Sequence, residues 1–244
     1  MLRPRFFTAQ PLQAGQGIIL EKEPSRHIAR ALRMRVDDRL CLFDGEGQEV
    51  AATITDVGRD RVTVSMATPQ AIDRESPLDI TLAIALSRGD RMDTVIQKAT
   101  ELGVATIRPL ISERTGVRLD SDRLSKKREH WERIAISACE QCGRNRIPAI
   151  SVADSLANTL RHAQDSAGLK LILHPTGTAE SLPQHCQSLL MLIGPEGGFS
   201  DAEVNAAVDH GFTAFQLGPR ILRTETAPLA AIAVAQARWG DFSI

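Results

Sequence analysis

The chain has 244 residues, of which 43% are hydrophobic and 24% charged, and its formal net charge at pH 7 is −1. This length suffices for one large domain or two smaller ones, and the near-zero charge excludes a uniformly basic RNA-binding protein, so contact with RNA must come from local patches. No apolar run approaches the roughly eighteen residues of a membrane span, and the N-terminal segment lacks the apolar region of a signal peptide, so we expect a cytoplasmic protein without a membrane partner.

The first element is a basic segment that we expect to form a helix. Arg26, Arg30 and Arg33 are spaced at i, i+4 and i+7, which would place three guanidinium groups on one helical face. Arg3 and Arg5 add charge at the same end of the chain. The opposite face would carry four apolar residues into a core: Ile28, Ala31, Leu32 and Val36. An RNA-binding surface and an ordinary solvated face both fit this pattern.

Residues 39–68 have the pattern of a small β-barrel. Turn-forming residues separate three short runs of strand composition, at 39–43, 49–55 and 61–66. The polar, proline-bracketed stretch at 68–77 predicts a linker. We therefore divide the chain into domains at 1–72 and 73–244.

Beyond the linker, strand and helix patterns alternate. Strands are expected at 79–86, 105–110, 169–173, 188–193 and 213–217. Helices are expected at 90–102, 122–141, 154–164, 200–209 and 227–237. This alternation predicts an α/β domain with a parallel sheet that helices cover on both faces.

Four cysteines in a chain of this length do not indicate a disulfide framework. Cys139 and Cys142 form a C-x-x-C pair in a helical pattern that runs from Trp131 to Gly143. Because no second pair completes a zinc site, we assign them a structural role and expect no metal.

A first glycine-containing loop follows the apolar run 188–193. Gly194, Gly197 and Gly198 allow the backbone to turn or to approach a ligand closely. Ser200 and the glutamate three residues later form a capping box, which predicts the start of a helix. An ordinary strand-to-helix turn also fits, and the loop has neither the Lys-Ser/Thr ending of a P-loop nor a Gly-x-Gly-x-x-Gly sequence.

A second loop follows the expected strand 213–217, which Gly218 ends. Thr224 is expected to cap the next helix, with Glu225 in its first turn. Three charged residues would crowd at the start of that helix, as functional groups or as a solvated loop: Arg220, Arg223 and Glu225. Because both loops follow parallel strands, we expect them at one edge of the sheet, where such sheets bind ligands.

The chain resembles the RsmE-type family of SPOUT RNA methyltransferases in two phrases of specific order and spacing, IGPEGGFS at 193–200 and LGPRILRTETA at 217–227. Weaker matches extend the resemblance over nearly the whole chain, at Arg3–Phe7, His27–Arg33, Lys98–Val104, Ser112–Thr115 and Glu140–Arg144. One departure from the family is Arg88, because relatives commonly carry Lys at this position. A guanidinium in place of an ammonium would change a single-point contact with phosphate into a two-pronged, bidentate one.

The resemblance implies a PUA-like RNA-binding barrel followed by a SPOUT domain whose C-terminal chain forms a trefoil knot. It also implies a homodimer that takes S-adenosylmethionine as methyl donor, releases S-adenosylhomocysteine and methylates uridine N3 in small-subunit (16S) ribosomal RNA. The donor site would be formed by backbone and apolar side chains of three segments: Leu173, His174, Pro175, Ile193, Gly194, Pro195, Gly197, Gly198, Leu217, Gly218, Ile221 and Leu222.

Uridine N3 carries a proton that must leave before or during methyl transfer. Arg223 and Arg220 are candidates to stabilise the resulting negative charge. Glu225 or Glu196 could accept the proton, or either could simply pair with an arginine, and the sequence does not choose between them. His174 is better explained as a structural residue than as a base.

Six arginines are candidates for RNA contact: Arg3, Arg5, Arg26, Arg30, Arg33 and Arg144. Arg144 follows a predicted helix end. It could contact RNA, in that case across a dimer interface, or it could instead stabilise the C-terminus of the helix. Two alternative functions remain. One is a SPOUT methyltransferase acting on another base or on a ribose 2′-hydroxyl, and the other is a non-catalytic, ribosome-associated RNA-binding protein.

Overall fold

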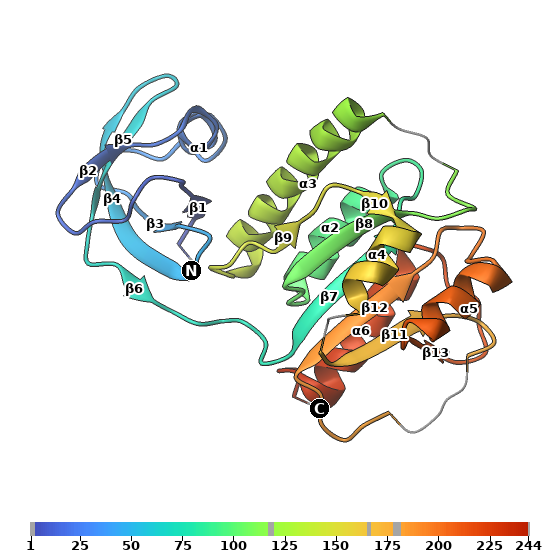
Figure 1. Ribbon diagram of the computed structural model, residues 1–244. Helices are drawn as coiled ribbons and strands as arrows, with labels where there is room; N and C mark the ends of the chain where they lie inside the picture. Colours follow the sequence, from blue (N-terminus) through green and yellow to red (C-terminus); the bar gives the residue numbers. More distant parts are fainter. Residues whose placement is uncertain (1–2, 117–119, 165–166, 178–181, 244) are drawn as a thin grey trace. The chain divides into compact units, whose positions relative to one another are not determined.

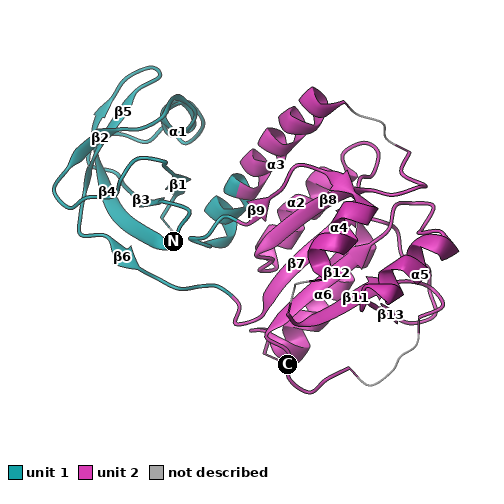
Figure 2. Cartoon of the chain, in the orientation of Figure 1, with its two compact units in different colours: residues 1–75, 136–147 teal, residues 76–135, 148–244 magenta. Residues whose placement is uncertain are grey.

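The computed structural model describes residues 3–116, 120–164, 167–177 and 182–243 (Figure 1). The chain forms two compact units, which Figure 2 draws in different colours. The first unit comprises Met1–Glu75 and Ile136–Ile147, and the second comprises Ser76–Ala135 and Pro148–Ile244. No helix in the described ranges combines the length and the apolar character needed to cross a membrane.

The first unit is built on a β-sheet. Its strands are β1 (Arg5–Phe7), β2 (Gly17–Ile19), β3 (Arg39–Phe43), β4 (Gln48–Val57), β5 (Val62–Met66) and β6 (Gln70–Ala71). They lie in the order β1-β3-β4-β5-β2, and β6 pairs with β4. The three predicted strands are confirmed as the antiparallel β3, β4 and β5, whose alternate side chains build the core: Leu40, Leu42, Val50, Ala52, Ile54, Val62, Val64 and Met66. β6 lies within the predicted linker.

The basic helix near the N-terminus is shorter than predicted. α1 (Lys22–Arg26) continues into one π-helical turn, η1 (His27–Ala31), and ends there. Because Arg33 has a left-handed φ of 52°, the three arginines do not share one helical face, and that prediction was wrong. The wider π turn also changes the side-chain directions that a 3.6-residue period assumes. Ile28 is buried as expected, but three of its predicted core neighbours are exposed: Ala31, Leu32 and Val36.

The second unit contains the predicted parallel sheet. Its strands are β7 (Asp79–Ala85), β8 (Thr106–Ile111), β9 (Ala149–Ile150), β10 (Asp154–Ser155), β11 (Leu169–Leu173), β12 (Ser188–Ile193) and β13 (Thr213–Phe215). Their order is β10-β8-β7-β12-β11-β13, with β9 beside β8, and each pairing is parallel. Its helices are α2 (Arg91–Glu101), α3 (Ser121–Cys142), α4 (Leu156–Ala163), α5 (Asp201–Asp209) and α6 (Thr226–Trp239), and the last part of α3 belongs to the first unit.

Helices cover both faces of this sheet (Figure 1). Along β12, Leu190 and Leu192 belong to the core beneath α4 and α5. Leu189 and Met191 point to the opposite face, where they line a crevice beside Ala231 of α6. A strand buried on both faces needs a continuous apolar run, which is why residues 188–193 do not alternate with polar ones.

Some predicted boundaries were wrong. Asp154–Ser155 was expected to begin a helix, but it is extended and pairs with β8 as β10. The Ser155 hydroxyl then caps α4 by accepting a hydrogen bond from the amide of Asn158 at 3.2 Å. The last strand ends at Phe215 rather than at Leu217.

A charged network joins four segments of the first unit. The guanidinium groups of Arg5 and Arg74 donate to the Glu49 carboxylate at 2.6 and 2.7 Å, and Arg5 also donates to the side-chain oxygen of Asn145 at 2.6 Å. Burial by itself would raise the pKa of Glu49, but the hydrogen bonds from Arg74 and Arg5 outweigh it and lower that pKa to about 2. Glu49 therefore holds the first strand and the end of the linker together.

We predict that Glu49→Gln lowers the free energy of unfolding by about 2 kcal/mol at neutral pH, because two guanidinium groups lose an ionised partner. The folded pKa of about 2 lies below the ordinary value of 4.5. The stabilisation is therefore present above that ordinary value and is lost as the pH falls towards the folded pKa. Urea unfolding at about pH 7 and at about pH 3 measures both effects.

The matched control is Glu46, an exposed carboxylate on the same hairpin that forms no ion pair among the described residues. Glu46→Gln should change the free energy of unfolding by less than about 0.5 kcal/mol. Equal losses in the two variants would contradict the role of Glu49, as would a Glu49 effect that does not shrink in acid.

Candidate active site

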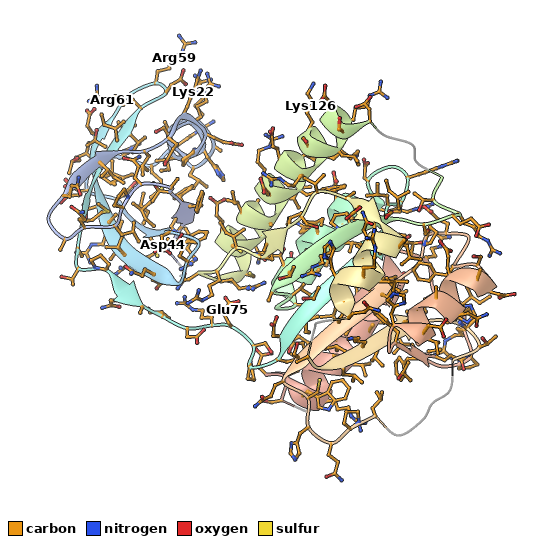
Figure 3. All side chains as sticks on the ribbon, viewed as in Figure 1. Lys22, Asp44, Arg59, Arg61, Glu75 and Lys126 are labelled. Atoms are coloured by element: carbon orange, nitrogen blue, oxygen red, sulfur yellow. The ribbon has the colours of Figure 1, made fainter. Side chains whose placement is uncertain are left out.

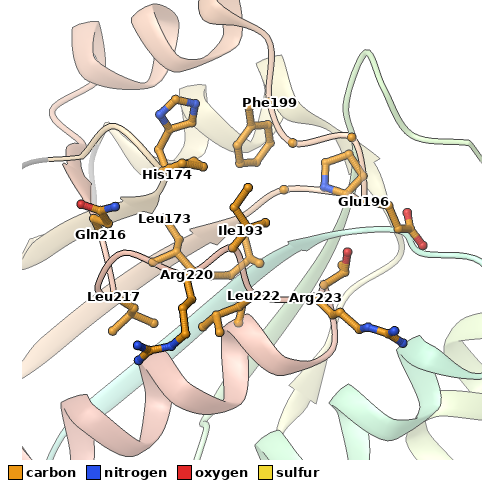
Figure 4. Close-up of a pocket in the computed structure, with 18 of the residues that line it drawn as sticks. Leu173, His174, Ile193, Glu196, Phe199, Gln216, Leu217, Arg220, Leu222 and Arg223 are labelled. Atoms are coloured by element: carbon orange, nitrogen blue, oxygen red, sulfur yellow. The ribbon is translucent and has the colours of Figure 1, made fainter.

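The carboxyl ends of three neighbouring strands open into one cavity of about 690 Å³. β12 pairs with β11 and β11 pairs with β13, all in parallel, so the loops after these strands meet at one edge of the sheet. The cavity is lined by residues 173–175, 193–199 and 216–225 (Figure 4). Every residue that the sequence suggested for donor binding and for chemistry lines it: Leu173, His174, Pro175, Ile193, Gly194, Pro195, Glu196, Gly197, Gly198, Leu217, Gly218, Arg220, Ile221, Leu222, Arg223 and Glu225.

The first loop turns tightly where side chains are absent. A Cβ atom on Gly194 would lie 3.2 Å from Phe199, and Gly198 has a left-handed φ of +68°. The predicted capping box is present. The Ser200 hydroxyl accepts from the amide of Glu203 at 3.4 Å, and the Glu203 carboxylate accepts from the amide of Ser200 at 2.9 Å. This cap begins α5 directly after the loop and fixes the loop's end.

The start of the helix that follows the second loop differs from the prediction. Gly218 has a left-handed φ of +94°, and α6 begins at Thr226 with Glu225 at the N-cap position and no side-chain cap. The prediction that Thr224 caps this helix was therefore wrong. The carbonyl of Arg223 accepts from the amide of Thr226 at 2.9 Å, which closes a turn just before the helix.

The cavity wall combines aliphatic side chains with unpaired backbone amides. Leu173, Ile193 and Leu222 lie together in Figure 4. In the described part of the chain, no acceptor is found for the amides of residues 217, 218 and 222. Aliphatic side chains contact the faces of a flat heterocycle, and backbone amides bond to its edge. The site is therefore suited to a ligand of that kind.

The imidazole of His174 and the thiols of the C-x-x-C pair are further potentially reactive groups, and their contacts favour a structural role. The amide of His174 donates to the carbonyl of Phe215 at 3.0 Å, and its ring Nδ1 shares a hydrogen bond of 2.8 Å with the Thr176 hydroxyl. On α3, burial raises the pKa of the Cys139 thiol to about 12, while Cys142 is exposed. Within the described residues, no cluster of His, Cys, Asp or Glu is arranged to hold a metal ion.

Two carboxylates of the cavity share one arginine that the sequence did not suggest. Arg91, the first residue of α2, donates to Glu196 at 2.5 Å and lies 3.7 Å from Glu225. Burial opposes ionisation of Glu196, but hydrogen bonds from its own amide, from the amide of Arg88 and from Arg91 outweigh it, so its pKa lies below the usual range. Glu196 is therefore held in its charged form.

The sequence also did not suggest Arg114, whose guanidinium donates to the carbonyls of Gly197 at 3.0 Å and Phe199 at 3.4 Å. Arg91 and Arg114 follow β7 and β8, which end at the same edge of the sheet as the two glycine loops. That shared edge was the signal that could have identified them, because β7 and β8 were themselves predicted as parallel strands.

Arg220 and Arg223 come from one loop but extend in different directions. Figure 4 shows Arg223 on the side of Glu196 and Arg220 on the side of Leu217. Both are exposed at the mouth of the cavity, and neither side chain forms an ion pair with a described residue. Their charges are thus available to a bound anion.

The six arginines suggested for RNA contact have different surroundings. Arg3 and Arg33 are exposed. Arg26 and Arg30 are exposed but both contact Asp60 on the β4–β5 hairpin, at 3.0 and 2.5 Å. The side chain of Arg5 is 9% exposed and Arg144 is 5% exposed, and they pair with Glu49 and Glu75. RNA contact by these two would require exchange of internal bonds.

Further basic residues extend this surface. Arg59 and Arg61 flank Asp60, and Lys22 belongs to α1 (Figure 3). Lys22 lies one turn before Arg26 on the same helix. Arg59 and Arg61 are distant along the chain from Arg26 and Arg30, and the contacts of Asp60 bring these two groups together.

Residues 74–236 match the model of the RNA methyltransferase domain family, and residues 20–66 match that of the RNA methyltransferase PUA domain. Ribosomal RNA small subunit methyltransferase E of Buchnera aphidicola is 37% identical over 98% of this chain and 98% of its own, and that of Bacillus subtilis is 34% identical over 92% and 91%. The chain belongs to the ribosomal RNA small subunit methyltransferase E family. The resemblance stated from the two glycine phrases is therefore confirmed.

Solved structures of this family support the same assignment. A Neisseria gonorrhoeae ribosomal RNA small subunit methyltransferase E bound to S-adenosyl methionine is 39% identical, has a TM-score of 0.89, and the match covers 99% of this chain and 100% of that one. A Legionella pneumophila protein described as a methyltransferase in complex with the bound cofactor SAM is 43% identical, with a TM-score of 0.94 over 99% and 100%. The fold, a PUA-like unit and a SPOUT-type α/β unit, is that of this family.

Proposed function

We propose that this protein transfers a methyl group from S-adenosylmethionine to small-subunit ribosomal RNA, and that N3 of a uridine is the acceptor. The observation that carries the proposal is the single cavity formed by both glycine loops in a chain whose relatives are named for this reaction and bind this donor. The uridine N3 assignment rests on the family resemblance. A different base or a ribose hydroxyl is the outcome that would correct it.

The residues that line the cavity fit this donor. A volume of about 690 Å³ lies within the range of small-molecule sites. The amides of residues 217, 218 and 222 would bond the adenine edge, and Leu173, Ile193 and Leu222 would cover its faces. When bound, the donor supplies an electrophilic methyl group on a sulfonium.

The charged residues of the cavity supply the remaining requirements. Arg223 and Arg220 would stabilise negative charge that develops on the uracil carbonyl oxygens as N3 loses its proton. Of the two carboxylates, we assign proton acceptance to Glu225. Glu196 is held ionised by three N–H donors, which makes it the weaker base, whereas Glu225 has only a 3.7 Å contact with Arg91. Arg91 would then hold both carboxylates in position.

The remaining expectations complete the proposal. We propose that residues 1–72 bind RNA through Arg3, Arg26, Arg30 and Arg33, that residues 73–244 form the SPOUT domain, and that its C-terminal chain is knotted. A homodimer is supported by exposed apolar residues on α6 and nearby loops, since Val234, Ile221 and Phe242 are 47%, 88% and 41% exposed. We place the protein in the cytoplasm, where its RNA substrate is found.

Mass spectrometry of nucleosides from small-subunit rRNA tests the function directly. RNA from cells that contain the protein should yield N3-methyluridine, and RNA from cells that lack its gene should not. A ribose-methylated nucleoside or a different methylated base lost in the deletion strain would reassign the acceptor. No difference between the strains would instead favour a non-catalytic RNA-binding protein.

The donor loop can be tested with matched glycines. Gly198 and Gly211 have φ of +68° and +85°, and an added Cβ would meet nothing closer than 4.0 Å at either position. Alanine should therefore cost each variant about 1 kcal/mol of stability through backbone strain. Calorimetric titration should show S-adenosylmethionine affinity five- to tenfold lower in Gly198→Ala, because relief of strain moves the cavity wall. Unchanged donor affinity in Gly198→Ala, or an equal loss in Gly211→Ala, would argue against this loop.

Arg223 should act on the reaction more than on donor binding. We expect Arg223→Gln to lower kcat by about 100-fold or more, as loss of a preorganised charge at a developing anion does. The Kd for S-adenosylmethionine should change by less than about twofold. Single-turnover methyl transfer and calorimetry measure the two quantities, with Arg161→Gln on α4 as the control. Equal losses in rate and donor affinity would remove Arg223 from this role.

A further inference from the structure

A second cavity of about 630 Å³ adjoins the donor cavity and shares Arg91, Arg114, Glu196 and Gly197 with it. Arg88, which the sequence singled out without a role, lines only the second cavity. The side chains of Arg88 and Arg114 come from the loops after β7 and β8, at the edge of the sheet that carries the donor loops. The second cavity is therefore a continuation of the site towards those loops.

The charges of this cavity are not balanced. Arg88 Nε donates to the carbonyl of Gly116 at 3.2 Å, and Arg114 donates to the carbonyls of Gly197 and Phe199. A carbonyl oxygen orients a guanidinium without neutralising it. Glu196 is already paired with Arg91, so the lining has one further carboxylate, Asp90, against two further cations, Arg88 and Arg114.

Arg88 is held with part of its guanidinium group exposed. Within the described residues, neither of its terminal nitrogens has a hydrogen-bond partner. A Cβ atom at Gly116 would lie 2.7 Å from Arg88 Nε and Nη2, so the guanidinium can pack there only because residue 116 has no side chain. Gly116 thus positions Arg88 in two ways, because its carbonyl accepts the Nε–H bond and its missing side chain leaves space for the guanidinium.

We propose that Arg88 and Arg114 bind a phosphodiester group of the RNA strand beside the target nucleotide. This inference rests on the proposed function. Two terminal nitrogens of one planar guanidinium match two phosphate oxygens, which a lysine ammonium cannot do, and this gives arginine at position 88 a reason. The carboxylate of the donor is the competing anion, but the first cavity is large enough for the whole donor and Arg88 does not line it.

Filter binding of radiolabelled small-subunit rRNA tests this without methyl transfer. Arg88→Ala should weaken RNA binding about tenfold and reduce the slope of log Kd against log salt by about 0.7–0.9, the change expected for one phosphate contact. Arg88→Lys should weaken binding about threefold, because charge remains but the fork is lost. Gly116→Ala should weaken RNA binding as much as Arg88→Lys does, because the added methyl group displaces the guanidinium of Arg88 but leaves its charge.

Arg161→Ala is the matched control. Arg161 is an exposed arginine near the end of α4. Because α4 runs from the end of β10 back to the start of β11, Arg161 lies towards the edge of the sheet where the strands begin, opposite to the edge that carries the two cavities. This variant should bind RNA like the wild type. Calorimetry with S-adenosylmethionine should give the same Kd, within about twofold, for all variants.

Three outcomes would overturn the proposal. RNA affinity of Arg88→Ala equal to that of Arg161→Ala would mean that no phosphate lies in this cavity. A loss of donor affinity in Arg88→Ala with RNA affinity unchanged would assign the cavity to the donor carboxylate. If the wild type binds no rRNA, both this proposal and the proposed function are wrong. If it binds rRNA but transfers no methyl group, only the proposed function is wrong.

Discussion

Parallel pairing of β12 with β11, and of β11 with β13, is the constraint on which the site depends. Each strand in a parallel arrangement ends at the same edge, so loops from distant parts of the chain meet there without any contact between their side chains. The two glycine loops are brought together in this way. The apolar character of 188–193 suits β12 to this central position, because the strand is buried on both faces of the sheet.

The arginines at this edge of the sheet differ in whether their partners are charged carboxylates or neutral carbonyl oxygens. Arg91 contacts carboxylates and is neutralised by them, whereas Arg88 and Arg114 are anchored by carbonyl oxygens and keep their charge. Arg220 and Arg223 have no ionic partner among the described residues. A site that must attract a polyanion and also hold an ionised carboxylate needs both kinds of arginine.

The sequence predicted best where one strong local signal was sufficient. β3, β11 and β12 begin and end where composition indicated, and the capping box at Ser200 starts α5 as expected. Prediction failed where tertiary contacts outweigh local pattern. The two-residue β9 and β10 exist only because β8 offers them a pairing edge. Residues 136–147 belong to the first unit although the helix that contains 136–142 begins in the second.

The candidate site was predictable for its loops but not for all of its charges. A glycine-rich phrase indicates a tight turn from the sequence alone. The role of Arg91 depends instead on which carboxylates its guanidinium reaches in the folded protein. The expected helical face of three arginines failed for a related reason, because one π turn at His27–Ala31 ends the 3.6-residue period on which the expectation depended. Periodicity predicts faces only while the helix geometry continues.

A crystal structure of the protein with S-adenosylhomocysteine tests the central claim most directly. We expect the adenine between the loop at 217–222 and the loop at 193–199, with the sulfur facing the side of the cavity that carries Arg223 and Glu225. Density for the ligand outside these loops, or a sulfur facing away from both residues, would contradict the account.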